Sequence, residues 1–410
     1  MKITRGGVSR GGQPPEVAGA VGEILRAVST TGDRAVLRYT AEFDRAELAP
    51  GQLEVSAEEL DASIGALEPA VLRGLRTAIA NVDAVVEAQL RGSVSVELPQ
   101  GHTVEVSELP VHRVGVYAPA GRAAYPSSVV MCAVTAKAAG VDQIAVCAPP
   151  GPGGRAHPVI LAACVLCGVT EVYRMGGAQA IGALAYGTES VRKVDVIVGP
   201  GNAYVQEAKR QVVGQVGIDG IAGPSELVVI ASEGADPELV ALDLMAQAEH
   251  GADSPLAVIS TDGTLLDRIV AHVEEMAPER ASVAEAELQV AQVEDPLVAL
   301  EMAERVAPEH LQLVGAEAAA LADRVRTAGC LFVGEGAATA FGDYVAGSNH
   351  VLPTGGAARF QSALSAATFR RRMARVSLPA GAAARLAPAG AALARAEGFP
   401  VHAESMERRA

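Results

Sequence analysis

Apolar positions in the first ninety residues recur with the spacing of α-helices. The segment PEVAGAVGEILRAVSTTGD opens with proline and closes at a glycine. A later segment, SAEELDASIGALEPAVLRGLRTAIANVDAVVEAQL, begins with a capping-box pair, Ser56 and Glu59. Two strand-like runs follow, TVEVSEL and RVGVYAP. The pattern therefore predicts helices over residues 15–90 and then short strands.

Beyond this region, short Val/Ile-rich runs alternate with helical segments. One series extends from RVGVYAP to NAYVQEAKRQVVG, and a second from ELVVIAS to CLFVGEG. Continuous apolar runs separated by helices are typical of parallel strands covered on both faces. From about residue 361 the chain is Ala-rich and reads as helical.

The predicted fold is thus α/β, with two Rossmann-like parallel-sheet domains, a helical N-terminal region and a C-terminal helical arm. The expected divisions are a leader over 1–14, a first α/β domain over 15–116 plus 226–360, a second over 117–225 and the arm over 361–410.

Composition narrows the class of protein. The chain has 410 residues, half of them apolar, and a formal charge of −15, which disfavours binding to nucleic acid. The sequence lacks the long uncharged apolar run of a membrane span and the apolar core of a signal peptide. The five cysteines are few and odd in number, which favours a reduced, cytoplasmic protein. Cys164 and Cys167 form a CxxC inside an apolar helical run, which predicts core packing.

Polar residues follow three strands of the first series. Tyr117 ends one strand, Gln179 lies in the turn GGAQA after the next but one, and Asn202 lies in GPGNAY after the last. Ligands of α/β sheets gather at the carboxyl ends of strands, and helix N-termini favour anionic groups. These turns are equally compatible with a nucleotide site and with ordinary glycine-containing connections. The usual dinucleotide fingerprint, GxGxxG, is absent from these junctions.

The helical segment LVALDLMAQAEHG ends in candidate metal ligands. Gln247 and His250 are three residues apart and so share a helix face. Both can ligate a first-row metal, but a histidine at a helix C-terminus is also a common cap. The loop GDYVAGSNHVLPTGG adds Asp343, Asn349 and His350.

Further candidates lie in the tail and beside two strands. In the tail, Glu397 precedes His402 by five residues, and simple solvation would also explain both. Glu309 and His310 in VAPEHLQLV could act as general bases or form a charged helix end. Ser225 in AGPSEL could be a ligand contact or a turn residue.

Taken together, the motifs resemble the histidinol dehydrogenase family. The matching segments are GGAQAIGALAYGT, VGPGNAYVQEAKRQV, IAGPSE, AQAEHG, VAPEHLQ, GDYVAGSNHVLPTGG and AEGFPVHA, with TTGDRAVLRYTAEFD near the start. They span nearly the whole chain. The resemblance implies a homodimer, with one Zn²⁺ per subunit, that oxidises L-histidinol through L-histidinal to L-histidine with two NAD⁺. This is the last step of histidine biosynthesis.

The resemblance also assigns roles to individual residues. It implies that Glu309 and His310 act as the acid–base pair. The implied zinc ligands are Gln247, His250, Asp343 and His402, the last from the partner subunit's tail, so that the two subunits share each active site. The implied NAD contacts are Tyr117, Gln179 and Asn202. The implied substrate contacts are Ser225 and Glu397 together with Gln247, His250, His310, Asp343 and His402.

One departure from the family and two other functions remain open. The segment YAPAGRA carries Ala120 where the family usually has glycine, which could alter the shape of the cofactor loop.

The chain could be a related zinc/NAD dehydrogenase acting on another small alcohol or diol. It could also be a non-catalytic metal- or nucleotide-binding protein, although the presence of Glu309 and His310 disfavours that alternative.

Overall fold

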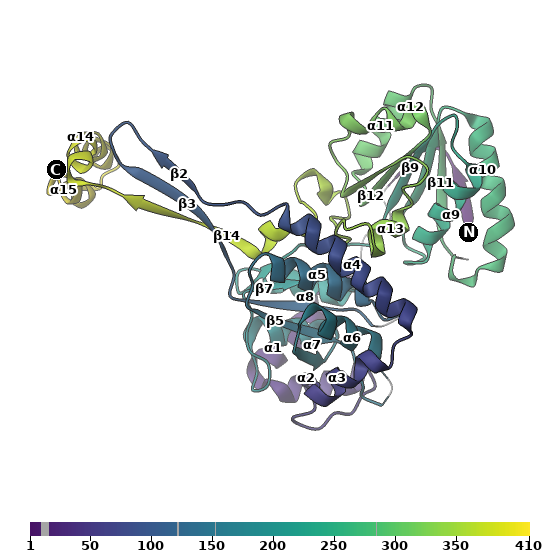
Figure 1. Ribbon diagram of the computed structural model, residues 1–410, viewed down its shortest axis with the longest axis horizontal. Helices are drawn as coiled ribbons and strands as arrows, with labels where there is room; N and C mark the ends of the chain where they lie inside the picture. The colour runs from purple at the N-terminus through teal and green to yellow at the C-terminus, as the bar shows by residue number, and fades with distance from the viewer. Residues whose placement is uncertain (10–15, 121–122, 152, 284) are drawn as a thin grey trace. The chain divides into compact units, whose positions relative to one another are not determined.

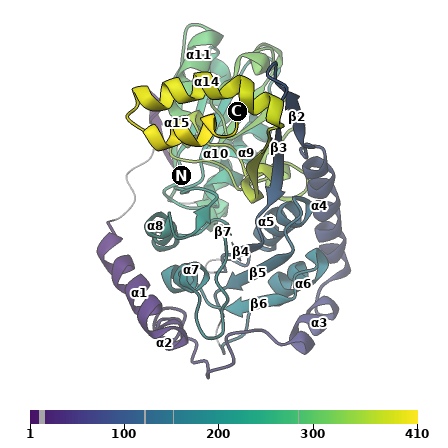
Figure 2. The ribbon, with the colours of Figure 1, turned by 90° about the vertical axis from the view of Figure 1, so that its left-hand side faces the viewer.

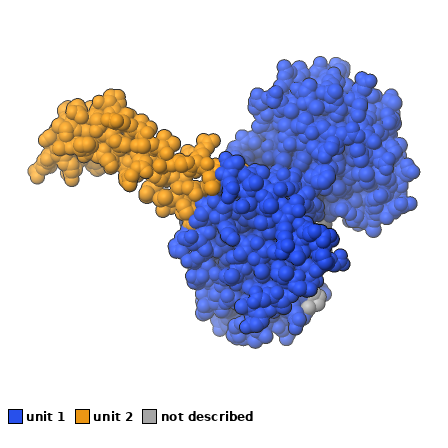
Figure 3. Space-filling view, in the orientation of Figure 1, with its two compact units in different colours: residues 1–88, 112–369 blue, residues 89–111, 370–410 orange. Residues whose placement is uncertain are grey.

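The computed structural model describes residues 1–9, 16–120, 123–151, 153–283 and 285–410. The chain forms two compact units, coloured separately in Figure 3. Unit 1 comprises Met1–Ala88 and His112–Phe369, and unit 2 comprises Gln89–Val111 and Arg370–Ala410. The domain boundaries expected from the sequence remain a prediction. None of the helices within the described residues is long and apolar enough to cross a membrane.

Unit 1 contains two parallel β-sheets, each flanked by helices (Figure 1). The first, sheet A, has the strand order β1-β11-β10-β9-β12-β13, and its described pairings are all parallel. Its strands are β1 (Lys2–Arg5), β9 (Leu227–Ala231), β10 (Leu256–Ser260), β11 (Glu287–Gln292), β12 (His310–Val314) and β13 (Cys330–Val333). Its helices are α9 (Pro237–Ala248), α10 (Gly263–Met276), α11 (Pro296–Val306), α12 (Ala316–Ala319) and α13 (Thr339–Tyr344).

Strand β1 was not expected from the sequence, which assigns residues 1–14 to a leader. The strand pairs in parallel with β11, with Ile3 opposite Leu288. A four-residue strand on a sheet edge leaves little trace in local hydropathy, because its pairing partner lies far along the chain. Residues 10–14 of the expected leader lie outside the described residues.

The second sheet, sheet B, has the order β6-β5-β4-β7-β8 and is also parallel. Its strands are β4 (Arg113–Tyr117), β5 (Gln143–Ala148), β6 (Glu171–Arg174), β7 (Val196–Val198) and β8 (Gly217–Ile218). Its helices are α5 (Pro126–Ala138), α6 (Pro158–Cys167), α7 (Gly177–Tyr186) and α8 (Ala203–Val212). The two sheets confirm the expected α/β class with parallel strands.

The predicted N-terminal helices are present as α1 (Ala18–Thr31), α2 (Asp33–Phe43), α3 (Ala57–Gly65) and α4 (Pro69–Glu87). They pack on the helices of sheet B: α1 on α7 and α8, α2 on α7, α3 on α6 and α4 on α5 (Figure 2). The domain division expected from the sequence instead groups residues 15–116 with the strands of sheet A. The apolar faces of these helices are compatible with either sheet, so the choice depends on tertiary packing rather than on periodicity.

Local sequence signals explain the elements well. Strands β4, β9 and β10 are buried along their whole length, as their continuous apolar sequences require. The Ser56 hydroxyl accepts a hydrogen bond from the Glu59 amide and caps α3. Cys164 and Cys167 are buried in α6, and burial raises the pKa of both thiols. The core interpretation of the CxxC is therefore confirmed.

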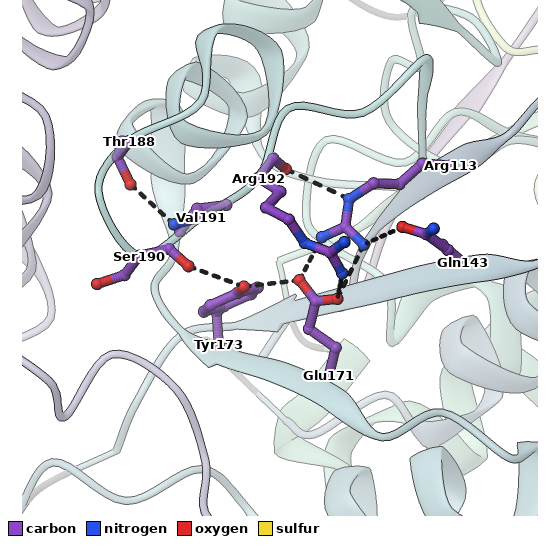
Figure 4. Close-up of polar contacts among 8 residues, drawn as sticks. All are labelled: Arg113, Gln143, Glu171, Tyr173, Thr188, Ser190, Val191 and Arg192. Atoms are coloured by element: carbon purple, nitrogen blue, oxygen red, sulfur yellow. Dashed lines mark hydrogen bonds and ion pairs between the residues drawn. The ribbon is translucent and has the colours of Figure 1, made fainter.

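Ion pairs hold together the amino ends of three neighbouring strands of sheet B (Figure 4). Arg113, Gln143 and Glu171 are the first residues of β4, β5 and β6. The buried Arg113 guanidinium binds both oxygens of Glu171 and also reaches Gln143, 3.3 Å away. The Tyr173 hydroxyl donates to Glu171 at 2.6 Å, and the exposed Arg192 donates at 3.1 Å. This network fixes the end of the sheet opposite the Tyr117 turn.

Unit 2 consists of an antiparallel sheet and two helices. Its strands are β2 (Val94–Glu97), β3 (Thr103–Pro110) and β14 (Arg370–Ser377), in the order β14-β3-β2. Helices α14 (Ala380–Ala396) and α15 (Pro400–Glu407) follow and pack on each other.

The prediction that the arm is helical from about residue 361 is wrong over β14. All eight residues of the strand pair with β3, and Arg372 and Arg375 each form an ion pair with the glutamate opposite. The paired strand lies more than 250 residues earlier, so this long-range pairing is invisible to a local reading of the Ala- and Arg-rich sequence. The helical prediction holds for α14 and α15.

Candidate functional site

The carboxyl ends of the strands of sheet B bring the three predicted cofactor turns together. Tyr117 ends β4, and its buried hydroxyl accepts a hydrogen bond from the Gly177 amide at the start of α7, at 3.2 Å. Asn202 caps α8 by accepting from two backbone amides, so the capping interpretation is confirmed for it. The turn that carries Asn202 lies against β4, because a Cβ on Gly199 would meet the Tyr117 carbonyl oxygen at 2.2 Å.

Gln179 is the least satisfied polar side chain of this rim. It is fully buried, and neither its amide nitrogen nor its oxygen has a hydrogen-bond partner among the described residues. Buried amides are almost always paired, so an orphaned one indicates a group that binds something further. Ala120 follows β4 on the same side, but the next two residues lie outside the described part of the chain. Its effect on the loop stays a prediction.

A second polar cluster lies at the amino ends of β9 and β12 in sheet A. The Ser225 hydroxyl donates to the Glu309 carboxylate, and the Glu226 amide donates to the same oxygen at 3.0 Å. In return, the Glu309 amide donates to the Glu226 carboxylate at 3.1 Å. These bonds hold the nearly buried Glu309 side chain in one orientation.

His310, the first residue of β12, has a defined tautomer. Its Nδ1 atom lies 3.1 Å from the Glu226 carbonyl oxygen, which can only accept a hydrogen bond. Nδ1 therefore carries a proton, and in the neutral form of the ring the lone pair lies on Nε2. Nε2 lies 4.0 Å from a carboxylate oxygen of Asp343 in α13. The arrangement leaves Nε2 as the basic atom of the cluster.

The C-terminal turn of α9 joins this cluster. The Gln247 amide nitrogen donates to the Ser225 hydroxyl at 2.5 Å, while its buried oxygen has no partner among the described residues. His250 Nε2 lies 3.7 Å from Asp343 Oδ2. The bond to Asp343 raises the pKa of His250 against the opposing effect of burial. Burial alone would raise the pKa of Asp343, but the nearby imidazoles, led by His250, lower it.

The loop after α13 supplies two further polar residues. Asn349 donates to the Met131 carbonyl oxygen and to Thr135, both in α5. His350 is more deeply enclosed, and its buried Nε2 has no partner among the described residues. Burial lowers the pKa of His350 to about 4, so this imidazole is neutral at pH 7.

The location of the second cluster departs from the usual rule for α/β sheets. That rule expects ligands at the carboxyl ends of strands, where the predicted cofactor residues of sheet B lie. Glu226, Glu309 and His310 instead lie where β9 and β12 begin. Sequence reasoning also missed Glu226, which binds Glu309, His310 and the Gly355 amide. Its position next to Ser225 was the one available signal.

Comparisons with known proteins agree with one another. The family model described as histidinol dehydrogenase matches residues 9–410. A histidinol dehydrogenase from Gluconobacter oxydans is 43% identical over 410 residues, covering 98% of this chain and 94% of the relative. One from a Synechococcus species is 44% identical over 396 residues, covering 95% and 91%. The crystal structure of histidinol dehydrogenase from Elizabethkingia anophelis superposes with a TM-score of 0.94 at 31% identity, covering 100% of this chain and 98% of that one.

The chain belongs to the histidinol dehydrogenase family. Six of the site residues predicted from the sequence are gathered in the cluster of sheet A: Ser225, Gln247, His250, Glu309, His310 and Asp343. Within the described residues, no group of three or more His, Cys, Asp or Glu side chains is placed to hold a metal ion. Glu397 and His402 are exposed residues of unit 2, where His402 packs on Phe399. Their roles stay predictions.

Proposed function

We propose that this protein oxidises L-histidinol to L-histidine through L-histidinal, with two NAD⁺ as hydride acceptors, in histidine biosynthesis. The observation that carries the proposal is the Glu309–His310 pair, buried and hydrogen-bonded at the start of β12 in a member of this family. A base with a free lone pair and an oriented carboxylate can serve as general bases for successive alcohol and aldehyde oxidations.

His310 is the proposed base for the alcohol. Its Nδ1 proton is held by the Glu226 carbonyl, so Nε2 can take the hydroxyl proton while the hydride leaves the adjacent carbon for the nicotinamide. The aldehyde then adds water to form a hydrate, from which a second hydride can leave.

Glu309 is the proposed base for that water, with His310 assisting. The hydrogen bonds from Ser225 and the Glu226 amide orient the carboxylate without using its second oxygen, Oε1. That oxygen can accept the proton of the attacking water.

The donor set of the cluster fits a Zn²⁺ ion, one per subunit. Gln247 contributes a buried oxygen with no partner among the described residues, and His250 and Asp343 face each other across 3.7 Å. We propose His402 of a second copy as the fourth ligand, which makes the enzyme a homodimer with shared active sites. When bound, the ion would position the substrate and act as a Lewis acid. Glu397 would contact the substrate beside it.

The rim of sheet B is the proposed NAD site. Tyr117, the orphaned Gln179 amide and Asn202 lie at or after the carboxyl ends of β4, β6 and β7, and the start of α7 offers backbone amides to an anionic group. The sequence lacks GxGxxG, so the cofactor would be bound by a different loop arrangement. As a biosynthetic enzyme, the protein is proposed to act in the cytoplasm.

One stoichiometric measurement tests the function. Zinc-loaded protein is given L-histidinol and NAD⁺, and the NADH and histidine formed are counted. Two NADH per histidine are expected. A panel of other small alcohols and diols, assayed in parallel, tests for a related dehydrogenase. Turnover of another alcohol with none of histidinol would reject the proposed substrate, and zinc binding without any NADH would reject the enzyme activity.

A further inference from the structure

Asp44 occupies an unusual position at the end of α2. Its backbone amide closes the helix by bonding to Thr40, and the next residue, Arg45, has a φ of 54°, a conformation rare outside glycine. The Asp44 side chain is directed inward. Its Oδ2 atom is buried and has no hydrogen-bond partner among the described residues.

A role in stabilising α2 does not explain this carboxylate. The C-terminus of a helix carries partial negative charge, so an acidic side chain there is unfavourable. Burial raises the pKa of Asp44 from 3.8 to about 6, so the group is still largely ionised at pH 7. A buried charge with an unpaired oxygen destabilises the fold unless a ligand supplies the missing donors.

The Asp44 carboxylate lies beside the proposed NAD site. Its Oδ1 atom is 3.3 Å from the point that a Cβ on Gly176 would occupy, and Pro149 lies 2.6 Å from the same point. Gly176 and Gly177 form the turn after β6 that reaches the Tyr117 hydroxyl, and Pro149 directly follows β5. Asp44 therefore lies at the carboxyl ends of β5 and β6.

That place has a known use in dinucleotide-binding sheets. With the order β6-β5-β4-β7-β8, β5 is the second strand of sheet B along the chain. In such sheets an acidic residue near the end of the second strand commonly binds the ribose hydroxyls of NAD. Here β5 is followed by PPGPGGR, which contains no acid. Asp44 brings a carboxylate to the same strand end from the N-terminal helices.

We propose that Asp44 binds the ribose hydroxyls of the adenosine half of the cofactor and thereby selects NAD⁺ over NADP⁺. The inference rests on the proposed function, because it assumes that the rim of sheet B holds the cofactor. Ribose hydroxyls would donate to the carboxylate, including its unpaired Oδ2. A 2′-phosphate would instead bring negative charge against it.

The test compares Asp44→Asn with a matched control, Glu47→Gln, which removes an exposed acid three residues away. Binding of ADP-ribose and of 2′-phospho-ADP-ribose is measured by isothermal titration calorimetry, and kcat/KM is measured with NAD⁺ and NADP⁺. Wild-type protein is expected to prefer the unphosphorylated probe about 100-fold. Asp44→Asn should reduce this ratio at least about tenfold, since a hydrogen bond to a charged group typically contributes that much. Glu47→Gln should leave it unchanged.

Asp44→Ser provides a second variant that removes the charge with a smaller side chain, and urea unfolding verifies that each variant is folded. The inference would be overturned if the wild-type enzyme oxidises histidinol with NAD⁺ but folded Asp44→Asn and Asp44→Ser keep the wild-type preference for the unphosphorylated probe. That result would leave the proposed function intact. A wild-type protein that binds neither probe and forms no NADH would overturn the proposed function itself, and this inference with it.

Discussion

At the scale of single residues, a substitution of Glu309 best separates the two oxidation steps, from L-histidinol to L-histidinal and from L-histidinal to L-histidine. Glu309→Gln keeps the shape of the side chain but removes the base that the hydrated aldehyde needs. We expect oxidation of supplied L-histidinal to fall about 10²- to 10³-fold. Oxidation of L-histidinol to the aldehyde should fall much less. Single-turnover NADH formation from each substrate measures both. Unimpaired aldehyde oxidation would contradict the assignment.

His310→Asn is the companion variant. It removes the Nε2 lone pair that the bond to the Glu226 carbonyl keeps available. Because both oxidations release a proton, both should slow by about 10²-fold or more. The same single-turnover assay applies. A first oxidation at the wild-type rate would reject His310 as the base for the alcohol.

The raised pKa of Asp44 also predicts how the stability of the protein depends on pH. Its pKa rises from 3.8 to about 6 on folding, so between these values the folded state binds more protons and stability falls as pH rises. Asp44→Asn removes this effect. Because the side chain is partly exposed, we expect the free energy of unfolding of Asp44→Asn to exceed that of wild type by about 1 kcal/mol above pH 7. Below pH 4 the two proteins should be equally stable. Urea unfolding at both pH values measures it. Equal gains in stability at both pH values would show that the raised pKa of Asp44 is not the cause.

The residue scale also shows what the sequence can predict. Motif resemblance identified Gln247, His250 and Asp343, and the structure brings all three into one cluster. It could not reveal the tautomer of His310 or the role of Glu226, because both depend on a hydrogen bond between neighbouring strands. Asp44 escaped notice for the same reason: its significance comes from the distant turn it contacts.

At the scale of elements, the ion-pair network at the amino ends of β4, β5 and β6 should stabilise the folded protein by a measurable amount. Glu171→Gln leaves the buried Arg113 without its carboxylate, which should destabilise the protein by about 3 kcal/mol. Burial alone would raise the pKa of Glu171, but bonds from Arg113 and Tyr173 outweigh it and lower the pKa below 4.5. The folded carboxyl therefore holds fewer protons, and this stability is present above about pH 4.5 and lost as pH falls further.

A matched control for that variant is Glu207→Gln. Glu207 pairs with Arg210, an exposed arginine three residues on along α8, and ion pairs between such neighbours on a helix contribute less than about 1 kcal/mol. Urea unfolding at pH 7 compares the two variants. Equal losses would show that burial of Arg113 does not strengthen its pair.

Elements defined by local periodicity were predictable, whereas those defined by a distant partner were not. The alternation of apolar runs and helices predicted both parallel sheets, because buried strands and amphipathic helices leave different repeats. Strands β1 and β14 are short or exposed, and each exists through pairing with a strand more than 250 residues away. Which sheet the N-terminal helices cover was likewise decided by packing.

At the scale of the whole molecule, the decisive question is whether two copies share each active site. We propose that His402 of one subunit completes the site formed by Gln247, His250 and Asp343 of the other. His402→Ala should then lower zinc content, measured by metal analysis, and abolish activity. Gln247, His250, Glu309 and Asp343 of one subunit form what we call the core of its site, and Glu309→Gln should inactivate that core. Neither homodimer should be active.

Mixing these two inactive variants with verified subunit exchange separates the alternatives. In a hybrid dimer with shared sites, one site pairs an intact core with an intact tail, so an equal mixture should regain about a quarter of wild-type activity. The double variant His402→Ala/Glu309→Gln, exchanged with wild-type protein, should lower activity to about a quarter, because each hybrid site lacks one group. Sites built within one subunit would give no recovery in the first mixture and about half activity in the second.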